Sequence, residues 1–230
     1  MEATELRKLA ALEDRHWWYA ERRALLRRAL RTLSPSTALD IGAAGGGNTR
    51  TLVAAGWTSV ALEYSAEAAE IAHERGLNVI RADARALPFP DAAFGLVVAF
   101  DILEHVEEDD VMAAEIARVL RPGGTALIAV PADMKLWSAH DVAVHHVRRY
   151  DRDGLADVLS SAGLVIEELG SWNVLLRPVA AWRRKRSTGS DLDELSPALN
   201  AALRATVAAE RFLPVKRLPG VSLMARVRRP

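Results

Sequence analysis

The sequence predicts a doubly wound α/β fold, and two observations carry this prediction. Short apolar segments alternate with helical segments from residue 37 onward, and a glycine-rich turn follows the first apolar segment. Such alternation is typical of a mostly parallel sheet with helices on both faces. In that architecture, ligands bind at the carboxyl ends of the strands.

The individual elements follow from this alternation. Strands are predicted at Thr37–Ile41, Ser59–Glu63, Leu77–Arg81, Phe94–Ala99, Thr125–Val130 and Leu164–Leu169, with a closing strand over residues 220–227. Helices are predicted at Gly47–Ala55, Ala66–Arg75, Asp109–Leu120, Arg152–Ala162 and Ala198–Phe212. The expected sheet therefore has seven strands.

The first 33 residues are rich in Ala, Leu, Arg and Glu, which predicts two amphipathic helices before the break at Ser34-Pro35-Ser36. Three aromatic residues, Trp17, Trp18 and Tyr19, lie between them. Neighbouring side chains on a helix point about 100° apart, so the three cannot all face one core. We predict that residues 1–33 form a lid in which Trp17 and Tyr19 contact substrate. Packing of this segment onto the core of residues 34–230 is the alternative.

Composition excludes several function classes. The chain has 230 residues, with 30 basic and 30 acidic side chains, so no overall charge favours nucleic acid. It has no cysteine, which excludes disulfides, thiolate metal sites and a cysteine nucleophile. Neither a secretion signal nor a long apolar run is visible, and we expect a cytoplasmic protein that is a monomer or a homodimer.

The stretch from Ala38 to Thr51 predicts a ligand cradle. It reads A-L-D-I-G-A-A-G-G-G-N-T-R-T, so that Asp40 lies at the end of a strand and four glycines lead into a helix. Glycine adopts positive φ readily and has no Cβ, so a ligand can approach the backbone amides at the start of that helix. An ordinary glycine-rich turn is the alternative.

Acidic residues follow the next three strands. Glu63 ends the second strand, about twenty residues past the cradle, where a carboxylate can bind both ribose hydroxyls. Asp83 and Ala84 follow the third strand, where a carboxylate can accept from an adenine amino group, and Asp101 follows the fourth. One such residue is commonly a helix cap, but together they describe a site for a nucleoside.

Five motifs resemble one known family: D-I-G-A-A-G-G-G-N-T, V-A-L-E-Y-S, R-A-D-A-R-A-L-P-F, F-G-L-V-V-A-F-D-I-L-E-H-V and V-L-R-P-G-G. Their order resembles the class I S-adenosylmethionine-dependent methyltransferases, in the branch of ubiquinone-biosynthesis and small-molecule enzymes, over roughly residues 36–170. The resemblance implies a Rossmann-like sheet whose last strand is antiparallel, and S-adenosyl-L-methionine as cofactor. It places Gly42, Ala44 and Gly46 against the methionine portion, Glu63 at the ribose, Asp83 at the adenine, and Asp101 and Leu103 near the methyl group.

Two positions depart from the family pattern. Ala44 stands where a glycine is usual, and Gly95 stands where an aspartate commonly begins the fourth strand. A nicotinamide-dependent oxidoreductase is the main alternative, since Gly42, Ala44 and Gly47 nearly complete a dinucleotide-binding motif. Asp40 argues against it, because it puts a charge where dinucleotide folds usually bury an apolar strand residue, and Asp83 argues against it, because a dinucleotide site does not require it. A non-catalytic protein that binds S-adenosylmethionine is a third hypothesis.

The acceptor is expected beside residues 131–150. A hydroxyl nucleophile must lose its proton, and histidine is suited to accept it near neutral pH. This segment contains three histidines, and we predict His146 as the first choice for the base and His140 as the second. The remaining candidates for substrate contact are His105, Trp137, His145, Arg149 and Tyr150, although the last two could instead anchor the loop. The predicted reaction is methyl transfer to a small molecule, at a hydroxyl oxygen.

Two further predictions concern metals and membranes. The histidines lack the helical spacing of a metal-binding motif, so no metal is expected. A helical insertion at about residues 173–212 is expected to set specificity or mediate dimer contacts. Its start, Trp172–Arg186, combines aromatic and basic residues, and contact with a membrane surface is a minor hypothesis.

Overall fold

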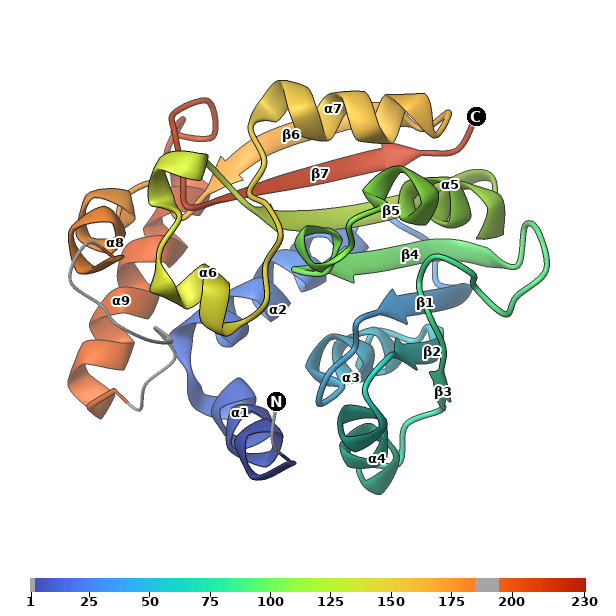
Figure 1. Ribbon diagram of the computed structural model, residues 1–230, viewed down its shortest axis with the longest axis horizontal. Coiled ribbons are helices and arrows are strands. Elements are labelled where there is room, and N and C mark those ends of the chain that lie inside the picture. Colours follow the sequence, from blue (N-terminus) through green and yellow to red (C-terminus); the bar gives the residue numbers. More distant parts are fainter. Residues whose placement is uncertain (1–2, 185–194) are drawn as a thin grey trace.

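The computed structural model describes residues 3–184 and 195–230. A seven-stranded sheet in the order β3-β2-β1-β4-β5-β7-β6 runs through the molecule (Figure 1). Its strands are β1 (Thr37–Ile41), β2 (Thr58–Glu63), β3 (Val79–Arg81), β4 (Phe94–Phe100), β5 (Leu120–Pro131), β6 (Val165–Trp172) and β7 (Ser222–Arg228). Only β7 is antiparallel to its neighbours β5 and β6. The predicted Rossmann-like α/β fold is therefore confirmed.

Helices cover both faces of this sheet. The described helices are α1 (Ala3–Arg15), α2 (Trp17–Leu30), α3 (Gly47–Ala54), α4 (Ala66–Glu74), α5 (Asp109–Val119), α6 (Ala139–Ala143), α7 (Arg152–Ser161), α8 (Arg177–Arg184) and α9 (Pro197–Ala209), with short 3-10 turns η1 (Leu103–His105), η2 (Met134–Leu136) and η3 (Glu210–Phe212). Several begin at capping residues that the sequence shows. Asp151, for example, accepts a hydrogen bond from the Gly154 backbone at 2.8 Å before α7.

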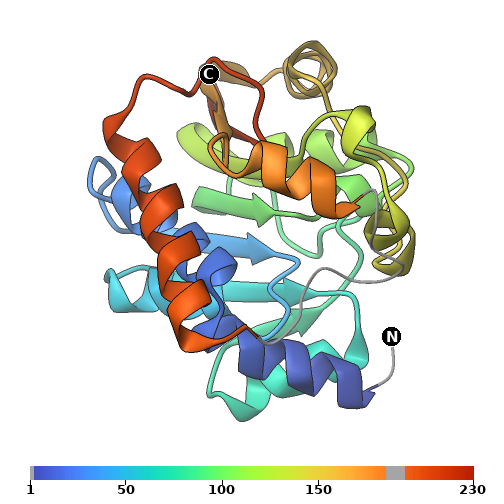
Figure 2. The ribbon, with the colours of Figure 1, turned by 90° about the vertical axis from the view of Figure 1, so that its left-hand side faces the viewer.

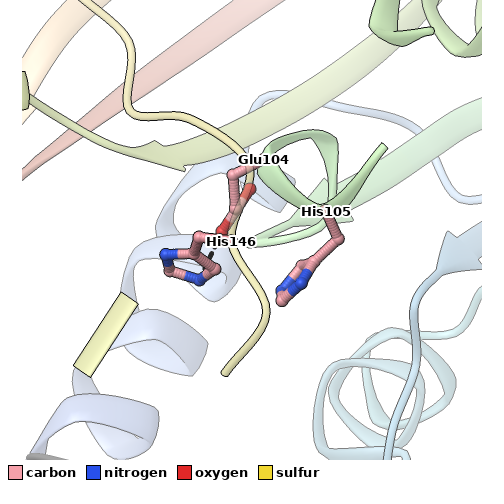
Figure 3. Close-up of side chains that lie close together, drawn as sticks. All are labelled: Glu104, His105 and His146. Atoms are coloured by element: carbon pink, nitrogen blue, oxygen red, sulfur yellow. Dashed lines mark ion pairs between the residues drawn. The ribbon is translucent and has the colours of Figure 1, made fainter. Parts of the chain in front are cut away.

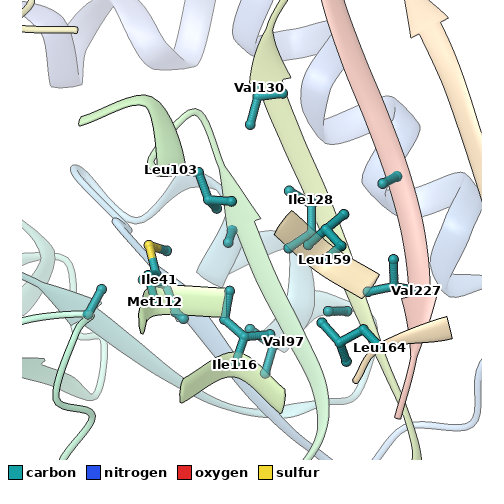
Figure 4. Close-up of a cluster of buried hydrophobic side chains, with 14 of the residues drawn as sticks. Ile41, Val97, Leu103, Met112, Ile116, Ile128, Val130, Leu159, Leu164 and Val227 are labelled. Atoms are coloured by element: carbon teal, nitrogen blue, oxygen red, sulfur yellow. The ribbon is translucent and has the colours of Figure 1, made fainter. Parts of the chain in front are cut away.

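The core has two parts because successive residues of a strand point to opposite faces. On one face, Val97 of β4 packs with Met112 and Ile116 of α5 and Leu159 of α7 (Figure 4). On the other face, strand residues pack against α3 and against α2, which contributes Leu26. This two-sided burial explains the nearly continuous apolar sequence of β4.

Two details add to the sequence-based description. The segment after β5 contains η2 and α6, and Ser138 and Asp141 form a capping box at α6. At Gly95, a Cβ atom would collide with the hydroxyl of Ser36. The aspartate that is usual there in the resembled family would require the Ser36 hydroxyl to move aside, whereas glycine leaves it in place.

Helices α8, α9 and η3 lie between β6 and β7, where the helical insertion was expected. Helix α9 runs alongside α2 (Figure 2), and the Asn200 side chain accepts from the Trp17 backbone at 2.8 Å. Most of the predicted polar loop, Ser187–Pro197, and Arg186 fall outside the described residues. Among the described residues, no helix has the length and apolarity needed to cross a membrane. Membrane-surface contact and the cytoplasmic location stay predictions.

Candidate active site

A cavity of about 390 Å³ lies at the carboxyl ends of the central strands, within the size range of small-molecule sites. It is walled by α2, the loop after β1, the segments after β4 and β5, and the helices between β6 and β7. The candidate residues that line it are Trp17, Tyr19, Gly42, Ala44, Asp101, His105, His140, His146 and Arg149. The candidates outside its wall are Asp40, Gly46, Glu63, Asp83, Ala84, Leu103, Trp137, His145 and Tyr150.

The glycine-rich loop has the strained backbone that its sequence predicts. Gly42 and Gly46 have φ values of 70° and 82°, and Ala44 also has a positive φ of 46°. A Cβ atom at Gly42 would approach the Ile102 side chain to 2.8 Å. The loop therefore turns sharply and presents backbone at Gly42 and Ala44 to the cavity.

Glu63 braces this loop. One carboxylate oxygen accepts from the Ala44 backbone at 2.8 Å, and the other accepts from Tyr64 and Ser65 at 2.9 and 3.0 Å. Asp83 instead binds the Arg85 guanidinium at 2.8 Å, and this hydrogen bonding lowers the pKa of Asp83. Both carboxylates lie at the strand ends where the sequence placed them, and neither belongs to the cavity wall.

Three other predicted cofactor contacts lie deeper than expected. Asp40 is buried and accepts from the Thr49 hydroxyl at 2.6 Å, so it joins the end of β1 to α3, and burial raises the pKa of Asp40 to about 7. Ala84 and Leu103 are buried in the main hydrophobic core.

The lid segment lines the cavity with aromatic side chains. Trp17, Trp18 and Tyr19 all line the cavity. The structure therefore does not divide them into residues that face the pocket and residues that pack only against the core. Trp18 and Trp172 meet edge to face with centroids 4.5 Å apart, and the buried Arg22 guanidinium lies 4.5 Å from the Trp172 ring. Arg22 also pairs with Asp101 at 2.5 Å, which ties α2 to the end of β4.

The structure separates the three histidines after β5. His140 and His146 line the cavity, and their ring centroids are 6.2 Å apart. His146 Nδ1 lies 2.8 Å from a carboxylate oxygen of the buried Asp141. His145 is exposed, and its carbonyl oxygen lies 3.3 Å from Nδ1 of His105. An imidazole oriented by a buried carboxylate is the arrangement that suits a proton acceptor.

Other residues of this segment hold it in place. Arg149 donates to Asp141 at 2.8 Å and to the Ala132 carbonyl at 3.0 Å. The buried Tyr150 hydroxyl donates to Asp109 at 2.6 Å. The anchoring role that the sequence left open for Arg149 and Tyr150 is thus supported by their contacts, and Trp137 lies beyond the cavity wall at the end of η2.

Two acidic residues of the site were missed in the sequence. Glu13 of α1 accepts from the Gly47 backbone at 2.9 Å and pairs with Arg75 at 3.1 Å, so the lid contacts the cradle directly. Nothing distinguishes Glu13 in sequence from the other acidic residues of an amphipathic helix. Glu104 is fully buried in the cavity wall, and the motif L-E-H-V, where it precedes His105, could have indicated it.

Comparison with known proteins gives the same family as the motifs. Residues 39–128 match the model of a methyltransferase domain. A protein of Mycolicibacterium smegmatis described as a probable S-adenosylmethionine-dependent methyltransferase is 24% identical over 168 residues, which are 70% of this chain and 65% of that protein. The demethylmenaquinone methyltransferase of Mycobacterium marinum is 34% identical over 116 residues, 50% of this chain and 48% of that enzyme.

A solved structure extends the likeness to the whole fold. It is the complex between the Haloferax volcanii Trm112 methyltransferase activator and a methyltransferase. The match has a TM-score of 0.67 at 21% identity, and it covers 99% of this chain and 94% of that chain. This chain spans less than two thirds of the length of the two curated relatives above. Residues 39–128 of this chain therefore match a methyltransferase domain, and the chain as a whole is similar in its motifs and its fold to S-adenosylmethionine-dependent methyltransferases.

Proposed function

We propose that this protein transfers a methyl group from S-adenosylmethionine to a hydroxyl oxygen of a small molecule. One observation carries the proposal: a single cavity joins the backbone of the glycine-rich loop to the Asp141-oriented imidazole of His146. The loop fits the cofactor, because Gly42 turns the chain at a φ of 70°, which favours glycine, and lines the cavity together with Ala44. Gly42 and Ala44 would hold the methionine portion, and Glu63 and Asp83 would face the nucleoside at the neighbouring strand ends.

When bound, S-adenosylmethionine supplies an electrophilic methyl group on a sulfonium. Because that group is already reactive, the chain mainly aligns the acceptor and removes its proton. His146 and His140 are the candidate proton acceptors in the cavity wall. Trp17 and Tyr19 on one side, and Leu176 and Val179 on the other, provide apolar surface. We therefore infer an acceptor that has an apolar body and one hydroxyl directed at the histidines.

The direct test is isothermal titration with S-adenosylmethionine, followed by mass-spectrometric detection of a methylated product in a metabolite extract. Replacing His146→Ala is expected to lower the rate about a hundredfold or more while cofactor affinity is kept. His73→Ala is the matched control, because His73 is exposed on α4 and does not line the cavity. Binding of a nicotinamide nucleotide without binding of S-adenosylmethionine would reverse the proposal.

A further inference from the structure

We propose that Glu104, His105 and His146 bind a divalent transition-metal ion, which holds the hydroxyl oxygen of the acceptor. The three side chains converge at the cavity wall, Glu104 and His105 from η1 and His146 from the segment after α6 (Figure 3). The role given to the ion rests on the proposed methyl transfer. The existence of the site does not.

The positions of the ligand atoms fit one ion. One nitrogen or oxygen atom from each residue lies within 4.8 Å of the others. Ligands bind ions such as Zn²⁺ at about 2.0–2.2 Å, so three ligand atoms around one tetrahedral ion lie about 3.4 Å from one another. Side-chain movements of about 1 Å therefore suffice to close the site. Two imidazoles and one carboxylate are a set that binds divalent transition metals and leaves coordination positions open.

The second observation is the state of Glu104 itself. Its side chain is fully buried, and among the described residues neither carboxylate oxygen has a hydrogen-bond partner. The Nε2 atom of His146 lies 3.7 Å from one of these oxygens. A buried carboxyl group without partners is costly, and an ion at this point would satisfy it.

The outer contacts of both histidines favour metal binding. His146 Nδ1 lies 2.8 Å from Asp141, so Nδ1 carries the proton and the lone pair of Nε2 faces Glu104. Arg149 fixes Asp141 in turn. His105 Nδ1 lies 3.3 Å from the His145 carbonyl oxygen, which likewise leaves Nε2 for an ion. Carboxylate or carbonyl partners of this kind orient the histidines of metal sites.

Sequence spacing could not indicate this set. The expectation of no metal considered the three histidines of one loop, but the fold pairs only His146 with two residues from a different segment. With Nε2 of His146 on the ion, His140 is the base. The hydroxyl proton passes to His140, the oxygen forms its bond to the methyl carbon, and the S–CH₃ bond breaks with its electron pair staying on sulfur. The ion makes the hydroxyl more acidic without itself being consumed.

The test uses the full chain, stripped of metal with a chelator. It is titrated with Co²⁺ and followed by the visible absorption of the ion, and the stoichiometry of bound Mn²⁺ and Zn²⁺ is measured after equilibrium dialysis. We expect about one ion per chain and a loss of affinity of tenfold or more in Glu104→Gln and in His105→Ala. His73→Ala is expected to bind the ion as the unmodified chain does. Circular dichroism melting of each variant verifies folding, and His105→Ala, at the cavity edge, provides a second variant if Glu104→Gln is unstable.

The outcomes separate the metal site from the proposed function. Titration with S-adenosylmethionine is carried out on the same samples. If S-adenosylmethionine binds but Co²⁺ keeps the absorption of the hydrated ion, the metal site is refuted and the methyl transfer stands. If the ion binds equally to Glu104→Gln, His105→Ala and the unmodified chain, it lies elsewhere and the site is again refuted. If the ion binds as expected but S-adenosylmethionine does not, the proposed function fails and the metal site stands.

Discussion

Replacing Asp40→Asn should change how stability depends on pH. Asp40 is buried beneath the glycine-rich loop, and burial raises its pKa from 3.8 to about 7. The folded state therefore binds a proton more tightly than the unfolded state. The resulting stabilisation is complete below about pH 4, and it is lost as the pH rises through about 7. An asparagine is neutral at every pH and removes this dependence.

The size of the effect follows from the two pKa values. Between about pH 5.5 and about pH 8, the protein should lose about 2 kcal/mol of unfolding free energy that the Asp40→Asn variant keeps. Urea denaturation of both proteins at the two pH values measures the difference. Other groups titrate in the same range, and the comparison between the two proteins cancels them. Asp153→Asn, on an exposed position of α7, is the control for loss of a carboxylate. A difference between Asp40→Asn and the unmodified protein that stays constant from pH 5.5 to 8 would refute the reasoning.

Two further predictions concern stability. Tyr150→Phe removes the buried hydrogen bond to Asp109 and should cost about 1–3 kcal/mol of unfolding free energy, with S-adenosylmethionine affinity unchanged by titration calorimetry. Gly46→Ala should cost more than Gly76→Ala in urea denaturation. Both glycines have positive φ, which costs an alanine about 1 kcal/mol, but a Cβ atom at Gly46 would also collide with Leu77, whereas Gly76 has open space. Equal losses of unfolding free energy in the two variants would show that Leu77 moves aside without a free-energy cost, and the prediction would be wrong.

The sequence by itself determined the fold and the cradle. The periods of strands and helices are local properties of the chain, so the order of the strands could be predicted directly. The observed β3 is shorter than its prediction and β5 is longer, but both differ from the predicted strands only at their ends. The glycine-rich stretch likewise predicted the positive φ values at Gly42 and Gly46, because steric exclusion acts within a few residues.

Only the tertiary structure decided which side chains share the cavity. The pairing of Glu104 with His146, and the contact of Glu13 with Gly47, join residues that are distant in sequence. Such contacts depend on how the sheet and its covering helices pack, and no local pattern encodes that packing. The same packing separated His146 from the exposed His145, although the two residues are adjacent in sequence, because the capped turn of α6 directs one imidazole to Asp141 and leaves the other outside.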